Sequence, residues 1–327
     1  MRSLKNIFRT EVDTSIEINN RKHTDKFILM GSCFSDEMFK YFSKFCFDIL
    51  KPYGTIFNPI TLSKNLEKAV LNIKFKEEDL LKTDELYLSW NHSGKYYNRY
   101  EKLLLKMLNE EQKKINKFIE EKADLMVTFG TATIYELSNN NTIVANCHKE
   151  SQNLFVKRRL DVAEIVGSWR SVLNKIDNNI IFTVSPVRHV RDGLINNNLN
   201  KSTLLIAINQ LKQEFSNAHY FPSYELLMDE LRDYRFYASD WIHPSLEAID
   251  FIWNKLSNQL IAADTLLIME EINKIRNELN HQSKFGKTKQ HILFLEKTLN
   301  KILKIQVHTG QYDWSKEISN LKSQLNN

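Results

Sequence analysis

Residues 26–37 of the chain read KFILMGSCFSDE: an apolar run, then Gly31-Ser32-Cys33, then the start of a helical pattern. Glycine allows a tight turn after a strand, and the first N–H groups of the following helix can stabilise an anion. Nucleophiles often occupy this turn in α/β proteins. The stretch therefore predicts Cys33 or Ser32 as a nucleophile, with the pKa of a cysteine thiol lowered toward neutrality. The alternative is that Cys33 is a small buried hydrophobe.

Short apolar runs predict the strands of a parallel sheet. They cover residues 27–30, 45–50, 125–129, 180–184 and 219–221. Segments with helical spacing lie between and after them, at 58–73, 100–121, 162–176, 202–215 and 245–262. Buried strands that alternate with helices are typical of an α/β fold with helices on both faces of the sheet.

The pattern changes after Ala263. Residues 266–279 and 292–305 have the spacing of two amphipathic helices, separated by the polar HQSKFGKTKQ. The sequence therefore predicts an α/β domain over residues 1–263 and a helical hairpin or extension over residues 264–327. These helices are candidates for self-association or for binding a partner.

Composition limits the classes of function. The 327 residues are 42% hydrophobic and 26% charged, with neither a membrane-spanning run nor the apolar core of a signal peptide, so a cytoplasmic location is expected. The net charge is +5, and residues 265–327 alone hold ten Lys/Arg and six Asp/Glu, a net of +4. Since the rest is close to neutral and no binding motif is present, nucleic acid is not an expected partner.

Cysteine and histidine spacing argues against a metal site. The three cysteines are an odd number without paired spacing, which disfavours a disulfide framework and structural zinc. Cys46 falls within an apolar run and is expected in the core, whereas Cys147 adjoins His148. His92 and His148 could bind substrate or a metal, but no H-x-H or H-x-x-x-H spacing joins them. The sequence therefore predicts neither metal nor cofactor.

Polar residues just beyond the predicted strands are candidates for a site, because open α/β sheets bind ligands at the carboxyl ends of their strands. They are Gly31-Ser32-Cys33, Tyr53-Gly54-Thr55, Gly130-Thr131, residues 185–189 and residues 240–243.

Two of these segments suggest specific chemistry. In the segment from Asp240 to His243, the carboxylate can hold one imidazole nitrogen while the other faces a nucleophile. Arg188 and His189 could contact a substrate carboxylate or phosphate, since arginine offers a bidentate fork. A salt bridge within the loop is the alternative for Arg188.

Several motifs in order resemble the GSCFA family, which is itself similar to the SGNH/GDSL hydrolase superfamily. They are GSCFS, KPYGTIFNP, FGTATIYE, ANCHK, TVSPVRH and FPSYELLMDELRDYRFYASDWIHPS, and together they span residues 27–262. The resemblance implies a flavodoxin-like three-layer α/β/α fold with a parallel sheet. It also implies a nucleophile after the first strand and a D-x-x-H block near the end of the domain. It implies no particular substrate.

The resemblance also assigns catalytic roles. Cys33 stands where the superfamily has its nucleophilic serine, with Ser32 as the rival one residue earlier. Asp240 would orient His243, and His243 would act as the general base.

Further roles follow for the oxyanion hole and for substrate binding. The N–H groups of Cys33 and Gly54 would stabilise the oxyanion. Ala132 stands where the superfamily has an asparagine, and Asn146 is the candidate replacement. The substrate-binding candidates are Gly130, Thr131, His148, Arg188 and His189.

These residues predict an acyl hydrolase or acyltransferase. It would act on a small-molecule, glycan or lipid ester, or on a thioester, through a covalent acyl-enzyme on Cys33 or Ser32. The alternative is a catalytically inactive SGNH-like module that serves binding or assembly.

Overall fold

The computed structural model describes residues 10–281, 286, 288–310 and 312–326. Its centre is a five-stranded sheet whose pairings are all parallel. The strands are β1 (Lys26–Gly31), β2 (Asp48–Leu50), β6 (Asp124–Phe129), β9 (Ile180–Val184) and β10 (Ala218–Tyr220). Their spatial order is β10-β9-β6-β1-β2. Counted along the chain this is the order 2-1-3-4-5 of flavodoxin-like folds, in which the switch point lies between the first and third strands.

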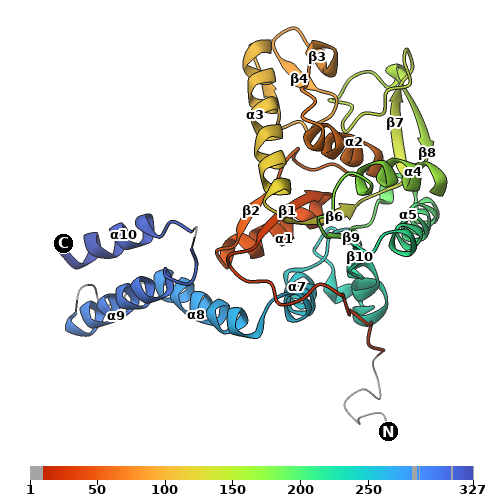
Figure 1. Ribbon diagram of the computed structural model, residues 1–327. Coiled ribbons are helices and arrows are strands. Elements are labelled where there is room, and N and C mark those ends of the chain that lie inside the picture. The colour runs from red at the N-terminus through yellow and green to blue at the C-terminus, as the bar shows by residue number, and fades with distance from the viewer. Residues whose placement is uncertain (1–9, 282–285, 287, 311, 327) are drawn as a thin grey trace.

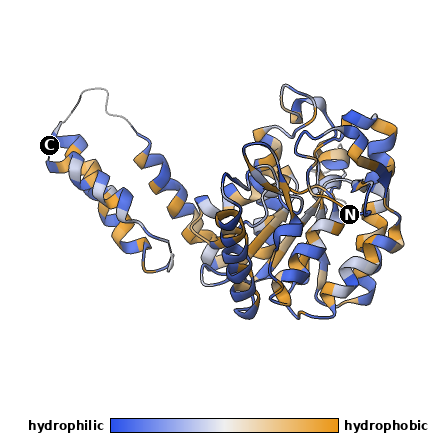
Figure 2. Ribbon diagram, turned by 90° about the horizontal axis from the view of Figure 1, so that it is seen from above, coloured by the Kyte–Doolittle hydropathy of each residue, from blue (hydrophilic) through white to orange (hydrophobic). Residues whose placement is uncertain are grey.

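Helices cover both faces of this sheet (Figure 1). They are α1 (Cys33–Lys44), α2 (Pro59–Val70), α3 (Glu101–Glu120), α4 (Val162–Leu173), α5 (Leu194–Glu214) and α7 (Leu246–Leu260). The side chains of Phe27 and Leu29 pack on one face, with α1 and α7. Those of Ile28 and Met30 pack on the other, with α2 to α5. Because alternate residues of β1 are buried on opposite faces, the strand is apolar from Phe27 to Met30. Figure 2 shows the hydrophobic residues gathered in the interior of the α/β body. The fold is a three-layer α/β/α sandwich.

All five predicted strands are present, with one correction. The second run was expected to begin at Phe45, but β2 begins at Asp48. Cys46 lies in the turn between α1 and β2 with φ of 65°, although it is buried as expected. Among the helices, α5 begins at Leu194, eight residues before the predicted start. Asn58 caps α2 through its side chain, and Pro59 takes the first helical position, as the sequence predicts.

Two small antiparallel sheets lie outside the central one. The first joins β3 (Leu80–Lys82), β4 (Tyr87–Ser89) and β5 (Tyr97–Asn98), and the second pairs β7 (Thr133–Leu137) with β8 (Phe155–Arg159). Figure 1 shows β3, β4, β7 and β8 at the same end of the molecule. The sequence pattern did not predict these strands, since each is short and only partly buried.

The C-terminal part is helical and projects from the α/β body (Figure 1). It contains α8 (Ala263–Leu279), α9 (Lys289–Ile305) and α10 (Ser315–Asn326). The first two correspond to the predicted amphipathic helices, while α10 was not predicted. The buried side of these helices continues the core that lies beside α1 and α7. No helix in the part of the chain that the structure describes is both long and apolar enough to cross a membrane.

Candidate active site

Gly31 makes the turn from β1 into α1. Its φ is 127°, and a Cβ atom built there would lie 2.1 Å from the carbonyl oxygen of Thr128 on the neighbouring strand β6. Only glycine tolerates both the conformation and the approach. Ser32 follows as the N-cap, and its N–H donates to the same oxygen of Thr128 at 3.1 Å. The turn is therefore held at the switch point of the sheet, with Cys33 as the first residue of α1.

Cys33 and Ser32 face different surroundings. Cys33 is half-buried and lines a pocket of about 410 Å³, whereas Ser32 is buried and does not line it. The hydroxyl of Ser32 has no hydrogen-bond partner among the described residues. Of the two candidate nucleophiles, Cys33 is the one with access to a cavity.

His243 lines the same pocket as Cys33. It belongs to the loop that precedes α7, whose N-cap Ser245 accepts a hydrogen bond from the N–H of Ala248. The Oδ2 atom of Asp240 lies 2.6 Å from Nδ1 of His243, and its Oδ1 atom accepts the backbone N–H groups of Ile242 and His243. With Nδ1 donating to this carboxylate, the lone pair of the neutral ring lies on Nε2. The D-x-x-H segment thus forms a carboxylate-imidazole pair at the pocket of Cys33.

The pKa of Asp240 is lowered, whereas the pKa of the Cys33 thiol is raised. Backbone and side-chain hydrogen bonds from His243 lower the pKa of Asp240 to about 2, so its carboxylate is ionised at neutral pH. Burial and the nearby Asp36 raise the pKa of Cys33 above its ordinary value. The backbone N–H of Cys33 at the helix start lowers this pKa, as expected, but burial outweighs it, so the net shift is opposite to the predicted one. Asp36 is itself held by Lys51 and by the hydroxyl of Thr55, and the charge of Lys51 opposes that of Asp36 at the thiol.

Helix α1 supplies a charged rim to the pocket. Glu37 and Lys40 stand four and seven residues after Cys33, on the same helix face, and form an ion pair of 2.7 Å between Nζ and Oε1. The opposite wall is apolar and includes Val187 and Leu246. Glu37 and Lys40 were not predicted as pocket residues, although their spacing from Cys33 places them on the same helix face and could have predicted it.

The predicted oxyanion donors do not all line the pocket of Cys33. The N–H of Cys33 points to its own sulfur and donates to no backbone carbonyl within the described part of the chain. Gly54 packs against the side chains of Ser93 and Tyr96. Asn146 is exposed, and its side-chain oxygen accepts the N–H of His148. Neither Gly54 nor Asn146 lines the pocket of Cys33, and their assignment to its oxyanion hole stays a prediction.

Three of the predicted substrate-binding residues make hydrogen bonds that connect parts of the fold. The N–H groups of Gly130 and Thr131 both donate to the carbonyl oxygen of Phe57. The Nε2 atom of His148 lies 2.8 Å from the carbonyl oxygen of Ser89, on β4. These contacts tie the loops after β6 and β7 to neighbouring segments, and none of the three residues lines the pocket.

His189 and Arg188 lie closer to the candidate base. Burial and the neighbouring Lys201 lower the pKa of His189 to about 4, and the charge of His243 adds to this lowering. The His189 ring packs edge-on to Phe57, with centroids 5.2 Å apart. Arg188 donates its N–H to the carbonyl oxygen of Ile242 at 3.2 Å. Both residues thus adjoin the loop of His243, while the Arg188 side chain opens to a different pocket.

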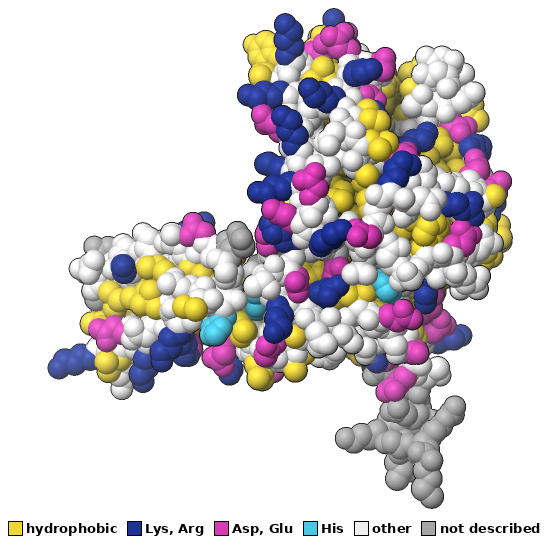
Figure 3. All heavy atoms as spheres, in the orientation of Figure 1, with side chains coloured by type: hydrophobic (Ala, Val, Ile, Leu, Met, Phe, Trp, Pro, Cys, Tyr) yellow, Lys and Arg dark blue, Asp and Glu magenta, His cyan; other side chains and the backbone are white. Residues whose placement is uncertain are grey.

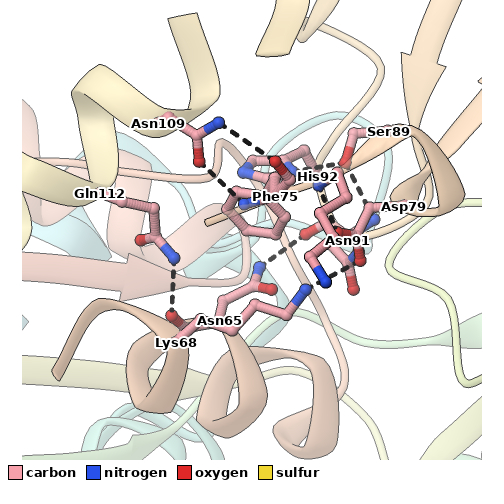
Figure 4. A network of polar contacts seen from close by, with 10 residues as sticks. Asn65, Lys68, Phe75, Asp79, Ser89, Asn91, His92, Asn109 and Gln112 are labelled. Carbon is pink, nitrogen blue, oxygen red and sulfur yellow. Dashed lines mark hydrogen bonds and ion pairs between the residues drawn. The ribbon is translucent and has the colours of Figure 1, made fainter. Parts of the chain in front are cut away.

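His92 is part of a buried network away from this site (Figure 4). Its Nδ1 atom lies 2.7 Å from the hydroxyl of Ser89, and burial lowers its pKa to about 3. The ring is enclosed by those of Tyr53, Phe75 and Tyr96. Within the described residues, no group of three or more His, Cys, Asp or Glu could hold a metal ion.

Comparison with known proteins identifies the family of this chain. The model of the GSCFA family matches residues 26–256, which is more than half of the chain. The chain belongs to the GSCFA family. A second model, for the C-terminal domain of GSCFA domain proteins, matches residues 272–327 and covers the C-terminal half of α8 together with α9 and α10. Searches of curated proteins and of solved structures found no match. In this GSCFA protein, Cys33 belongs to the segment Gly31 to Ser35, GSCFS, which differs from the family's name only in its last letter.

Proposed function

We propose that this GSCFA protein hydrolyses or transfers acyl groups through a covalent acyl-enzyme on Cys33. The observation that carries the proposal is the shared pocket of Cys33 and His243, with Asp240 hydrogen-bonded to the far nitrogen of the ring. The strand order and the position of the nucleophile at the switch point support a similarity to SGNH hydrolases.

The mechanism begins with a neutral thiol, because the pKa of Cys33 is raised. The Nε2 atom of His243 takes the thiol proton as the sulfur attacks the carbonyl carbon of an ester or thioester. The N–H of Cys33 stabilises the oxyanion. When the carbon–oxygen or carbon–sulfur bond breaks, His243 returns the proton to the leaving group.

The acyl group then leaves the enzyme in a second half-reaction. Water, an alcohol or an amine attacks the thioester carbonyl, His243 takes its proton, and the sulfur of Cys33 departs and is protonated again. Asp240 keeps the ring in the tautomer that both half-reactions need.

Intact-protein mass spectrometry tests this mechanism. Wild type is incubated with a panel of acyl esters and thioesters, and we expect an acyl adduct that is absent from Cys33→Ala and His243→Ala. Cys147→Ala is the matched control, because Cys147 is also half-buried but does not line the pocket. An adduct that survives in Cys33→Ala but vanishes in Ser32→Ala would move the nucleophile to Ser32.

A binding or assembly module without catalysis is the second candidate. It is favoured by the raised pKa of Cys33 and by the hydrogen bond that the Gly130 N–H donates to Phe57. Iodoacetamide labelling at pH 7.5, followed by peptide mass spectrometry, separates the two functions. If His243 acts as a base, Cys33 labels at least about tenfold faster than the buried Cys46, whose pKa is raised to about 11. Equal labelling, together with no acyl adduct, would favour the binding module.

A further inference from the structure

A second pocket, of about 570 Å³, lies behind the loop that carries His243. Val187 faces the pocket of Cys33, and the next residue, Arg188, faces this one. Because neighbouring side chains of an extended segment point to opposite sides, these two residues line different pockets. The other walls come from α5, from the π-helical turn η5 (Leu226–Leu231) and from residues 232–237.

Arg188 is the charged centre of this second pocket. Its guanidinium carbon lies 4.0 Å from the ring centroid of Tyr237 and 5.3 Å from that of Tyr234. Across the described part of the chain, no carboxylate lies within ion-pair distance of Arg188. The side chain of Arg188 also interacts with that of Tyr237, and its other N–H donors are available for a further acceptor.

The remaining charges of the pocket do not offset Arg188. Asp229 lies 3.9 Å from Arg232, and Asp233 lies 3.7 Å from Arg235, so both carboxylates have arginine partners near the surface. Lys201 is buried in the floor and donates to the carbonyl oxygens of Gly130 and Ser185, at 2.8 and 2.7 Å. Arg188 is therefore the main positive charge in the interior of the pocket. Burial lowers the pKa of Lys201 to about 7, which agrees with an amine that is held by carbonyl oxygens rather than by a carboxylate.

The lining also offers neutral recognition groups. Asn198 and Ser202 present polar side chains from α5, and the rings of Tyr224, Tyr234 and Tyr237 supply apolar faces. The segment that bounds the pocket is irregular: η5 is π-helical, and Arg232 has a left-handed φ of 40°. Such π-helical turns are frequent at functional sites.

We infer that this second pocket binds a small organic anion, a phosphate or carboxylate next to an apolar or ring-shaped group, with Arg188 as its anchor. The anion accepts hydrogen bonds from the guanidinium, and the apolar part packs against the tyrosines. The inference does not depend on catalysis by Cys33, so it is tested in the Cys33→Ala protein as well as in wild type.

Calorimetric titration with three probes tests the charge requirement. Phenyl phosphate and benzoate carry the two anionic groups on a ring, and benzyl alcohol carries none. We expect at least one of the two anions to bind at least tenfold more tightly than benzyl alcohol, and the stronger of them identifies the anionic group. Equal binding of all three probes, or no binding, would overturn the inference.

Two variants test whether the anion binds at Arg188. Arg188→Gln should weaken binding of the preferred anion at least tenfold, while Arg170→Gln, an arginine that pairs with Glu214 away from the lining, should leave it within twofold. If Arg188→Gln does not fold, phenylglyoxal modification of wild type gives the same information. The preferred anion should then slow the modification of Arg188, measured by peptide mass spectrometry, and leave that of Arg170 unchanged. Unaltered binding in Arg188→Gln, or unprotected Arg188, would show that the anion binds elsewhere.

Discussion

Gly31 is the residue at which strand β1 turns into helix α1, and its backbone conformation excludes a side chain. Its φ of 127° would strain an alanine, and the alanine Cβ would lie only 2.1 Å from the carbonyl oxygen of Thr128. Conformational strain of this kind costs about 1–3 kcal/mol. Cys33 takes its position from this turn, so stability and the geometry of the site depend on the same residue.

We predict that Gly31→Ala lowers the free energy of unfolding by at least about 1–3 kcal/mol in urea denaturation. Gly167→Ala is the matched control, because Gly167 lies inside α4 and its added Cβ would meet nothing within 4 Å. That control should raise stability by about 0.5–1 kcal/mol, since alanine favours helix. A Gly31→Ala protein as stable as wild type would contradict the steric argument.

The carboxylate of Asp240 orients the ring of His243 through its hydrogen bond with Nδ1. The Asp240→Asn side chain presents an amide to Nδ1, which favours the tautomer with its proton on Nε2 and removes the base from the thiol. We predict that acylation of Cys33 slows by about a hundredfold or more, with little change in unfolding free energy. Asp233→Asn is the control, since Asp233 also caps an exposed turn, through the N–H of Arg235. Equal acylation rates in both variants would remove Asp240 from the mechanism.

At the scale of elements, a polar network joins α2, α3 and the small sheet of β3 to β5 (Figure 4). Asn65 on α2 donates to the carbonyl oxygen of Asn91, and Lys68 pairs with Asp79 at 2.8 Å. Asn109 on α3 bonds both the N–H and the carbonyl oxygen of Phe75. The irregular chain between α2 and α3 is thus held by side chains of the helices, which explains how short strands that the sequence did not predict keep one arrangement.

The buried His92 in this network should make stability depend on pH. Its pKa is about 3 in the folded protein and about 6.5 when unfolded, so between these values the unfolded chain binds more protons. Stability therefore falls as pH decreases below 6.5, with a slope of up to about 1.4 kcal/mol per pH unit from this group.

We predict that urea denaturation of His92→Asn at pH 7 and 5 shows a smaller loss on acidification than wild type does. The variant itself should be less stable at pH 7, because the ring fills a buried site. His281→Asn, at an exposed position, is the control and should keep the wild-type dependence. An unchanged loss in His92→Asn would mean that other groups cause the acid sensitivity.

At the scale of the whole molecule, Arg276 on α8 connects the C-terminal helices with the α/β body. It donates to the hydroxyl of Tyr312 at 2.9 Å and pairs with Glu317 at 3.2 Å, near and within α10. On the other side it donates to the carbonyl oxygen of Lys44, at the end of α1. The position of α10 therefore depends on a half-buried cation that also contacts the body.

We predict that Arg276→Met increases amide hydrogen exchange in residues 315–326 by at least about fivefold, because hydrogen bonds to a charged group contribute about 1.5–3 kcal/mol. Lys274→Met is the control, since Lys274 pairs with Glu271 at an exposed position of the same helix. Exchange that rises equally in both variants, or in neither, would argue against this connection.

The C-terminal helices also expose apolar side chains. Figure 3 shows a hydrophobic group on their outer surface, and Leu267, Leu293, Leu303 and Val307 are among the exposed large hydrophobics. Self-association or partner binding through these helices stays a prediction. Light scattering of the full chain and of a chain that ends at residue 263 would test it, and unchanged oligomer size would contradict it.

The sequence by itself determined the fold class, the five central strands and the D-x-x-H pair. Buried strands must be apolar on both faces, and a loop carboxylate three residues before a histidine can bond it locally, so both features are visible in short stretches. Only the tertiary structure decided which neighbour of Gly31 faces a pocket, how the thiol titrates and where Gly54 and Asn146 point. The titration of the thiol depends on its burial and on Asp36, and the surroundings of Gly54 depend on Ser93 and Tyr96. These contacts come from packing that local sequence patterns do not record.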